Sequence, residues 1–183
     1  MNIVLFGASG TIGQRILREA LERGHSVTAI VRNPEEVKLS HLNLTVKAGD
    51  ILNSAIVAQD VAGYDAVISA VGPSRNQQPS MFVDAAHSLI EGLTRAGVRR
   101  LIVVGGAGSL EAALGTLVYD TPDFPAACRP GAVAHGEALQ IYRTADLDWT
   151  YFSPAYFIQP GERTGTYRVG FEQLRFDCDR FAV

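Results

Sequence analysis

The hydrophobic positions of the chain fall into short continuous runs that alternate with segments of helical periodicity. Five apolar runs are typical of buried parallel strands, and they cover residues 3–6, 26–31, 44–47, 65–70 and 100–104. A sixth run of the same kind covers residues 149–153. A helical segment is expected between each strand and the next. The alternation predicts an α/β fold, with a doubly wound parallel sheet of at least five strands in a three-layer αβα arrangement.

The helical pattern is clearest in three segments. The first opens directly after the first strand and stops at Gly24, and its apolar face consists of Ile12, Ile16, Leu17, Ala20 and Leu21. The second begins at Pro79 and stops at Gly97, and the third covers roughly residues 131–144. Residues 154–170 are rich in glycine, proline and charge, so a loop over the sheet edge is expected there. No repeat or linker divides the chain, which predicts a single domain over residues 1–183 with its substrate-facing part in roughly residues 105–170.

Composition and charge narrow the classes of partner. The 183 residues contain 16 Lys and Arg against 19 Asp and Glu, so the net charge of -3 disfavours nucleic acid. No apolar run approaches the ~20 residues that cross a bilayer, and residues 1–6 lack a charged leader, so a cytoplasmic protein with no membrane partner is expected. Cys128 and Cys178 form no Cys-x-x-Cys pair, and both are interpreted as ordinary thiols.

A glycine-rich turn stands at the carboxyl end of the first predicted strand. In such sheets ligands bind at the carboxyl ends of the strands. In the segment Gly-Ala-Ser-Gly-Thr-Ile-Gly of residues 7–13, the first glycine permits a tight turn, the second lets a pyrophosphate approach the backbone, and the third lets the helix pack on the strand. A turn that binds nothing is the alternative, but the strand before it and the amphipathic helix after it favour a dinucleotide. The predicted cofactor-binding residues of this turn are Gly7, Ser9, Gly10, Thr11, Ile12 and Gly13.

The end of the second strand indicates which cofactor is bound. An NAD-binding unit places a carboxylate there, about 20 residues beyond the glycines, to accept from the ribose 2′-hydroxyl. Here Arg32 stands at that place, and a guanidinium suits a 2′-phosphate. The alternative for Arg32 is a solvated cation at a strand end. We therefore expect NADP(H), with NADPH preferred over NADH.

Several motifs together carry a family resemblance. Besides the Gly-x-x-Gly-x-x-Gly turn, they are Arg32-Asn33-Pro34, Gly49-Asp50-Ile51, Ala70-Val71-Gly72, the segment Val-Val-Gly-Gly-Ala-Gly-Ser-Leu of residues 103–110, and Ser153-Pro154-Ala155. With these motifs the chain resembles the atypical short-chain dehydrogenase/reductases with a Rossmann fold, in particular the NmrA-like and NADH-flavin reductase-like NAD(P)H-binding proteins, and more distantly biliverdin reductase B.

The resemblance implies further cofactor-binding residues. It places Asp50 and Ile51 at the adenine, and it places the loop that begins with Ala70, Val71 and Gly72 over the nicotinamide ribose. Gly105, at the end of the fifth strand, is added to the same set. For Asp50 a helix cap is an equally good interpretation, although Asn53 could supply that cap instead.

The reaction is constrained by a pair that is missing. Ordinary members of the superfamily use Tyr-x-x-x-Lys to exchange a proton with a carbonyl. Alignment of the third helix through Glu137, as the resemblance suggests, puts Arg129 and Val133 in those two places. A flavin or a quinone accepts hydride at a conjugated centre and takes its proton from solvent, so such acceptors fit a site without a dedicated acid.

Two residues are candidates for contact with the substrate, although the catalytic residues cannot be assigned. Ser109 could bond the nicotinamide or the substrate, or it could cap a turn at residues 110–114. Tyr156 could stack on a planar acceptor, whereas core packing is the better interpretation for its neighbour Phe157. Tyr119 and Phe124 are expected in another wall of the cleft. The four histidines have no metal-ligand spacing, so no metal is expected.

Two classes of function remain open. The first is an NAD(P)H-dependent reductase that passes hydride from NADPH to a small planar acceptor such as flavin or quinone. The second is a redox-sensing regulator of NmrA type, which binds NADP(H) without turnover. The absence of the Tyr-Lys pair is neutral between the two, and the small size of the chain favours the enzyme. A monomer or a homodimer is expected in either case.

Overall fold

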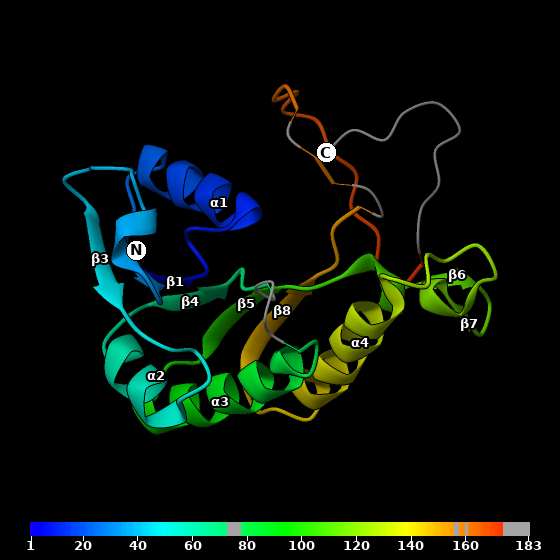
Figure 1. The fold of residues 1–183 in the computed structure, drawn as a ribbon. Helices are drawn as coiled ribbons and strands as arrows, with labels where there is room; N and C mark the ends of the chain where they lie inside the picture. The colour runs from blue at the N-terminus through cyan, green and yellow to red at the C-terminus, as the bar shows by residue number, and fades with distance from the viewer. Residues whose placement is uncertain (73–77, 156–157, 160, 174–183) are drawn as a thin grey trace.

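A parallel sheet forms the centre of the protein (Figure 1). The computed structural model describes residues 1–72, 78–155, 158–159 and 161–173. The sheet has six strands in the order β3-β2-β1-β4-β5-β8, and every neighbouring pair in it is parallel. The strands are β1 (Asn2–Phe6), β2 (Ser26–Val31), β3 (Leu44–Ala48), β4 (Ala66–Ser69), β5 (Arg100–Val104) and β8 (Asp148–Phe152). The predicted Rossmann-like α/β fold is confirmed, and the strand order reverses between β1 and β4.

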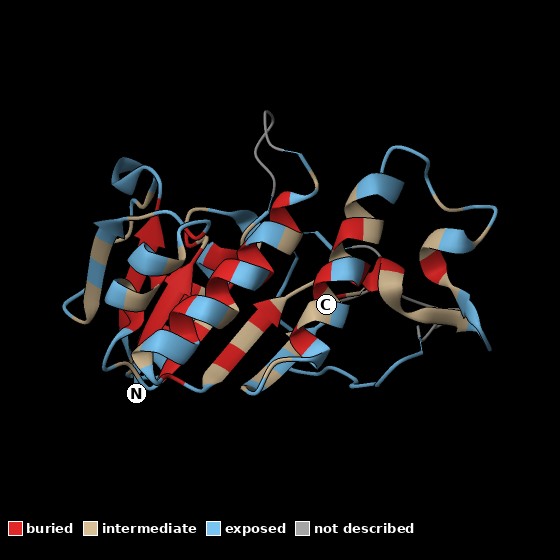
Figure 2. Ribbon diagram, turned by 90° about the horizontal axis from the view of Figure 1, so that it is seen from below, coloured by how far each residue is buried: buried red, intermediate tan, exposed pale blue. Residues whose placement is uncertain are grey.

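Helices cover both faces of this sheet (Figure 1). Helix α1 (Thr11–Glu22) lies on one face, and α2 (Ser54–Val61), α3 (Met81–Ala96) and α4 (Arg129–Arg143) lie on the other. Two buried clusters correspond to the two faces. Leu17 and Leu21 of α1 pack with Leu5 of β1, whereas Leu89 of α3 packs with Phe6 on the opposite side of the same strand. Burial is concentrated along the central strands and the inner faces of the helices (Figure 2).

The helix boundaries follow from the expected stop signals, with small shifts. Helix α3 ends at Ala96, and Gly97 adopts the left-handed conformation with φ +70°, which glycine takes without strain. The helix begins at Met81 and not at Pro79, whose carbonyl accepts from the Phe82 N–H in the preceding turn. Helix α4 begins at Arg129, two residues earlier than predicted, with Pro130 in its first turn.

The prediction of a helix between β2 and β3 was wrong. Within residues 32–43, all of them described, the chain forms a single 3₁₀ turn, η1 (Pro34–Glu36), where a helical segment was predicted. The proline fixes the turn, and the Asn33 side chain caps it by accepting from the Glu35 N–H, at 3.2 Å. Of the two alternatives for Ser109, the cap of a turn at residues 110–114 is not found, since its hydroxyl has no partner among the described residues. That segment contains β6 (Glu111–Ala113), which forms a hairpin with β7 (Thr116–Leu117) through a turn at Gly115 with φ +74°.

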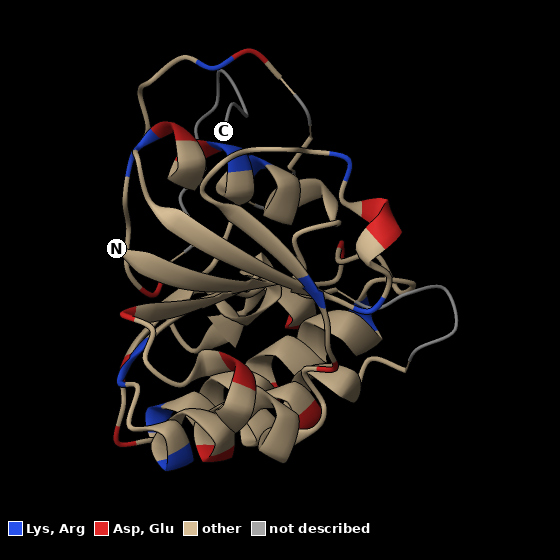
Figure 3. Cartoon of the chain, turned by 90° about the vertical axis from the view of Figure 1, so that its left-hand side faces the viewer, with Lys and Arg blue, Asp and Glu red and all other residues tan. Residues whose placement is uncertain are grey.

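Lys, Arg, Asp and Glu residues lie mainly on the helices and on the loops that join the strands (Figure 3). Among the described residues, no helix has both the length and the apolar character needed to cross a membrane.

Candidate functional site

The carboxyl ends of the central strands meet at one edge of the sheet. The Gly7 N–H donates to the Ile30 carbonyl at 3.4 Å, and the Ala70 N–H donates to the Phe6 carbonyl at 3.0 Å. The Gly49 N–H donates to the carbonyl of Val31, the residue before Arg32, at 3.0 Å. These bonds place the predicted turns beside one another at the point where the strand order reverses. This is the position at which open α/β sheets bind ligands.

The turn after β1 depends on two of its glycines for its own geometry. Gly7 has φ +82°, and a Cβ atom on it would lie 2.5 Å from the Ala70 carbonyl oxygen. A Cβ atom on Gly13 would lie 2.0 Å from the Gly7 carbonyl oxygen, so α1 could not pack at this depth with any other residue there. A Cβ atom on Gly10 would lie 3.3 Å from the Gly7 oxygen. The fold therefore restricts Gly10 much less than Gly7 and Gly13.

The amino end of α1 is suited to an anion. Gly10 is its N-cap residue, and no side chain caps the helix. Gly10 and Thr11 are exposed, and the Gln14 side chain donates to the Ser9 carbonyl at 2.8 Å, which fixes the turn. The first N–H groups of a helix have no partners within the helix and carry its partial positive charge. An exposed, uncapped helix end behind a glycine turn has the donors that a pyrophosphate requires.

Arg32 follows β2 at the same edge and is exposed. Among the described residues no hydrogen bond or ion pair engages its guanidinium, although Glu35 and Glu36 come soon after it. A carboxylate that could accept from a ribose 2′-hydroxyl is absent from the end of β2, since Asn33 follows Arg32 and uses its side chain to cap η1. The edge at this point offers a cation.

Asp50 and Ile51 lie in the turn after β3. Asn53 caps α2, because its side chain accepts from the N–H groups of Ala55 and Ile56, both at 3.1 Å. Asp50 is exposed and accepts from the Leu52 N–H at 3.0 Å, so its carboxylate does not cap the helix. The Ile51 side chain is buried in the core beside α2, which leaves its backbone for contact with a ligand.

A second glycine-rich turn follows β5. Ser69 of β4 pairs with Val103 of β5, so residues 70–72 emerge beside residues 104–106. A Cβ atom on Gly105 would lie 2.0 Å from the Tyr151 ring, and one on Gly106 would lie 3.1 Å from Cδ2 of His135. The turn continues into the 3₁₀ segment η2 (Ala107–Ser109).

Ser109 ends η2 with a buried hydroxyl. Its Oγ has no hydrogen-bond partner among the described residues. A buried hydroxyl without a partner costs free energy, and a ligand that satisfies it recovers that cost. The Ser109 Oγ therefore lies beside this turn with its hydrogen-bonding capacity unused among the described residues.

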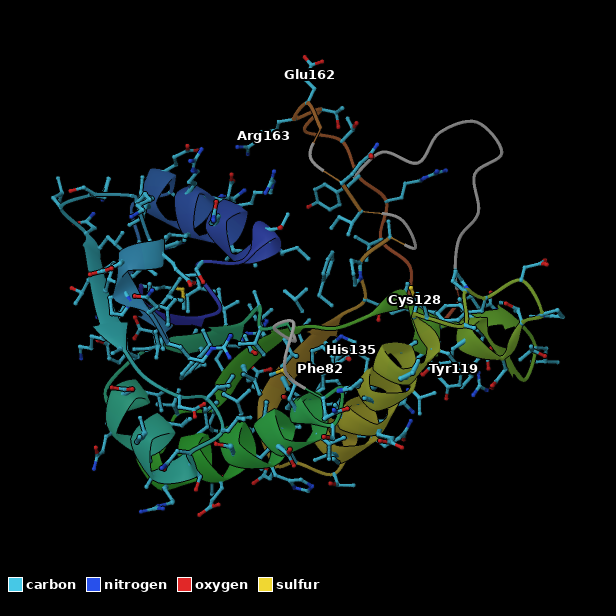
Figure 4. All side chains as sticks on the ribbon, in the orientation of Figure 1. Phe82, Tyr119, Cys128, His135, Glu162 and Arg163 are labelled. Carbon is cyan, nitrogen blue, oxygen red and sulfur yellow. The ribbon has the colours of Figure 1, made fainter. Side chains whose placement is uncertain are left out.

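His135, Tyr151 and Phe82 form a cluster beneath the second turn, and Figure 4 shows His135 beside Phe82. The Tyr151 hydroxyl donates to the His135 backbone carbonyl at 3.0 Å, and it lies 3.0 Å from Nδ1 of the same histidine. The His135 and Phe82 rings lie 3.7 Å apart between centroids. Burial lowers the pKa of His135 to about 4, and burial raises the pKa of the Tyr151 hydroxyl above its ordinary value.

Arg129, at one of the two positions of the missing Tyr-Lys pair, takes a structural role. Arg129 Nη2 donates to Asp120 Oδ1 at 2.7 Å, its Nε donates to the Tyr119 carbonyl at 3.1 Å, and its guanidinium lies 5.9 Å from the centre of the Tyr119 ring. The Tyr119 ring in turn lies against Gly108 and Gly136. Burial raises the pKa of the Tyr119 hydroxyl. The Tyr119 hydroxyl is therefore not a proton donor adjusted to neutral pH.

The structure brings most of the predicted residues to this edge, and it adds two. The turns that begin at Gly7, Asp50, Ala70 and Gly105 lie at the carboxyl ends of β1, β3, β4 and β5. Tyr156 and Phe157 lie outside the described residues. Sequence reasoning missed His135 and Tyr151, since a lone histidine on a helix and a tyrosine inside a strand both carry no local signal. Among the described residues, no three His, Cys, Asp or Glu side chains gather as metal ligands.

Comparison with known proteins identifies the family. The family model described as NAD(P)H-binding matches residues 7–179. YwnB of Bacillus subtilis (strain 168), an uncharacterized protein, is 42% identical over 174 residues, which cover 93% of this chain and 79% of YwnB. The chain belongs to the NAD(P)H-binding family of atypical short-chain dehydrogenase/reductases. The sequence-based resemblance is thereby confirmed, and NAD(P)H is the cofactor class of the family.

Solved structures of similar proteins agree with the fold. SP1627 of Streptococcus pneumoniae, provisionally named an NADH-flavin reductase, is 35% identical with a TM-score of 0.85, over 97% of this chain and 83% of SP1627. A Bacteroides thetaiotaomicron protein, provisionally named an epimerase, is 40% identical with a TM-score of 0.86, over 94% of this chain and 79% of that protein. The two names differ in reaction, so they do not establish the substrate of this family member.

The residues of the edge fit the cofactor of the family. The uncapped end of α1 offers donors to a pyrophosphate, and Gly10 at that end is exposed and has no side chain to cover them. The sheet edge then continues past Ala70 and Val71 to the second turn, where Ser109 has its unsatisfied hydroxyl. A dinucleotide laid across the switch point would follow this line.

Proposed function

We propose that this protein is a reductase that passes hydride from NADPH to a conjugated acceptor such as a flavin or a quinone. The observation that carries the proposal is the placement of Arg32 beside the uncapped amino end of α1, at the point where the strand order reverses. That placement offers one site for a pyrophosphate and one for a further phosphate. The provisional name of SP1627 supports a flavin as the acceptor.

Arg32 is the reason to choose NADPH over NADH. A guanidinium without a protein partner can form charge-assisted hydrogen bonds with a 2′-phosphate. NADH has a 2′-hydroxyl at that position, and the end of β2 provides no carboxylate to accept from it. Both features favour the phosphorylated cofactor.

The chain contributes position and shielding more than proton transfer. NADPH, when bound, supplies the hydride. Among the described residues around the second turn, the Tyr151 hydroxyl is bonded to His135 and Arg129 is paired with Asp120. Ser109 Oγ orients the nicotinamide or the acceptor by a hydrogen bond. The acceptor takes the hydride at its conjugated centre and a proton from water, so no side chain needs to change its charge.

The direct test is steady-state oxidation of NADPH with FMN or benzoquinone as the acceptor. We expect turnover with at least one acceptor, and a higher kcat/KM with NADPH than with NADH. Cofactor binding without turnover for any flavin or quinone would reject the reductase and favour the redox-sensing regulator. Failure to bind either cofactor would reject both functions.

Ser109→Ala tests the orienting role in the same assay. Loss of one neutral hydrogen bond costs about 1.4 kcal/mol or less, so kcat should fall about tenfold or less. The parent and the variant should share one pH profile, because the serine transfers no proton in this mechanism. A loss of several thousandfold would instead show a dedicated proton donor at this position.

A further inference from the structure

We infer that His135 and Tyr151 are positioning residues, whose hydrogen-bonded side chains form the surface on which residues 105–109 lie and thereby set the place of the Ser109 hydroxyl. The inference rests on the proposed function, because it assigns the reason for this surface to hydride transfer. It concerns the site beyond the cofactor-binding turn, where the family comparison names no residues.

The close contacts are the first step of the argument. Gly105 lies so near the Tyr151 ring that a Cβ atom would come within 2.0–2.5 Å of Cε1, Cζ and Oη. Gly106 lies over His135, with 3.1 Å between its Cβ position and Cδ2. A contact of this closeness is possible only when the backbone rests directly on the rings. Neither ring can therefore shift toward the turn without moving it.

The far end of the turn is held by the same helix. A Cβ atom on Gly108 would lie 2.6 Å from Cβ of Ala132, and one on Gly136 would lie 3.6 Å from Cβ of Ser109. Gly136 is the residue that follows His135 in α4. One turn of α4 therefore supports both ends of residues 105–109. The His135 ring supports the beginning, and the contacts of Gly108 with Ala132 and of Ser109 with Gly136 support the end.

The hydrogen bonds hold the His135 ring in place. The Tyr151 hydroxyl lies 3.0 Å from the His135 carbonyl, to which it can donate its proton. Nδ1 of His135 lies 3.0 Å from the same hydroxyl oxygen, so the ring and the backbone of one residue both contact this group. The Phe82 ring lies against the imidazole, with 3.7 Å between the ring centres.

The surroundings leave these rings little freedom. The cavity beside them has a volume of about 10 Å³, room for about one water molecule. Among the described residues its lining contains no Asp, Glu, Lys or Arg, and it reaches Val71, which follows β4 at the cofactor edge. The rings therefore join β8, α4 and the start of α3 directly beneath the place where the nicotinamide and the acceptor would meet.

Tyr151→Phe tests the inference, with Tyr142→Phe as its matched control. Tyr142 is also buried, and its ring centre lies 6.0 Å from that of Tyr151, but it is not among the atoms nearest to the Cβ positions of Gly105, Gly106 and Gly108. Each change removes one hydroxyl from the same core. We expect Tyr151→Phe to lower kcat with a quinone about tenfold and to leave the KM for NADPH within about twofold. Tyr142→Phe should change neither constant by more than about twofold.

A second pair of variants tests the bond through His135. The amide nitrogen of Asn can donate from nearly the place of Nδ1, whereas Leu fills the space without a donor. His135→Asn should keep most of the parent kcat, and His135→Leu should lose about tenfold. If Tyr151→Phe fails to fold, this pair decides the question. Equal losses of kcat in His135→Asn and His135→Leu would overturn the inference. They would show that the hydrogen bond to Tyr151 contributes nothing beyond the filling of the core.

Amide hydrogen exchange separates this inference from the proposed function. The Gly105 N–H donates to the Phe152 carbonyl and the Leu110 N–H donates to the Ala107 carbonyl, so both amides report on the turn. In Tyr151→Phe they should exchange about tenfold faster than in the parent, and in Tyr142→Phe they should not change. If the parent turns over no acceptor, the proposed function fails and the exchange rates alone decide. Equal rates in the two Phe variants would overturn the positioning role.

Discussion

The protein contains two glycine-rich turns at the carboxyl edge of one sheet, and they are built differently. In the turn after β1, the glycines make room for backbone, because Gly7 lies against Ala70 and Gly13 lies against Gly7. In the turn after β5, Gly105 makes room for the Tyr151 ring. The first turn is nearly self-contained, and its spacing can be read from a few consecutive residues. The second takes its shape from side chains some 30 to 45 residues further along the chain.

This difference predicts unequal costs for a methyl group in the two turns. Gly13→Ala should destabilise the fold by about 3 kcal/mol or more, because the atoms it meets are backbone and cannot rotate away. Gly105→Ala should cost about 1–3 kcal/mol, and a smaller residue at Tyr151 should relieve part of that cost. Urea unfolding of the single and double variants measures both effects.

Gly131→Ala is the control for those variants. A Cβ atom on Gly131 meets nothing within 4 Å, and the residue lies in α4, so alanine should stabilise the protein by about 0.5–1 kcal/mol. Equal destabilisation by Gly13→Ala and Gly105→Ala, with no relief in the double variant, would show that the two turns are not built differently.

The second turn should also respond to acid through His135, whereas the first contains no titratable group. The folded pKa of His135 is about 4, below the value of about 6.5 in an unfolded chain, so the unfolded state binds more protons between these values. The contribution of His135 to the free energy of unfolding is therefore fully present above about pH 6.5. It is lost as the pH drops toward 4, by up to about 3 kcal/mol in total. Within the described part of the chain, the other titratable groups of the surrounding cavity are the hydroxyls of Tyr142 and Tyr151.

The acid effect is measured as the difference between the parent and His135→Asn in urea unfolding from about pH 7.5 to about pH 4.5. Carboxylates elsewhere on the protein contribute to both proteins alike, so the subtraction isolates the histidine. The parent should lose more stability than the variant over this range. Parallel curves would contradict the burial of a neutral imidazole at this position.

Substitution of Arg32 tests whether the site beside the first turn prefers NADPH over NADH. Arg32→Ala should weaken the binding of NADPH by about 1.5–3 kcal/mol, the range for a charge-assisted hydrogen bond, and should leave NADH nearly unchanged. Arg99→Ala is the control, because it removes the same charge just before β5, at the opposite edge of the sheet. Calorimetric titration gives the four dissociation constants. Equal affinities of the parent for the two cofactors would reject the assignment of Arg32.

The comparison of the turns also explains how much was predictable from sequence. Strand order and layers followed from the alternation of apolar runs, and Gly97 and Gly24 marked helix ends because a positive φ favours glycine. The 3₁₀ turn in place of a helix after β2 was missed, because one proline and one Asn cap outweighed a weak helical pattern. His135 and Tyr151 could not be paired in advance, since their meeting depends on how α4 packs against β8.

Ser109 illustrates the same limit within the site. Its sequence context allowed a cap or a ligand contact. Only the packing of η2 against α4 shows that its hydroxyl is buried, caps nothing and has no partner in the described part of the chain. By contrast, the residues of the first turn were found from spacing alone, because the chemistry of that turn is carried by its own backbone.

Binding of NADPH to Gly10→Val tests the central claim, that the first turn is a cofactor site and not only a connection between β1 and α1. Gly10 has ordinary backbone angles, φ -74° and ψ 166°, and a Cβ atom there would lie 3.3 Å from the Gly7 oxygen. The free energy of unfolding of the variant should therefore lie within about 1 kcal/mol of the parent value. Its side chain would occupy the place where the pyrophosphate meets the helix. We predict that calorimetric titration shows an NADPH affinity at least a hundredfold weaker than that of the parent, about 2.7 kcal/mol or more. A folded variant that binds NADPH as tightly as the parent would contradict the account.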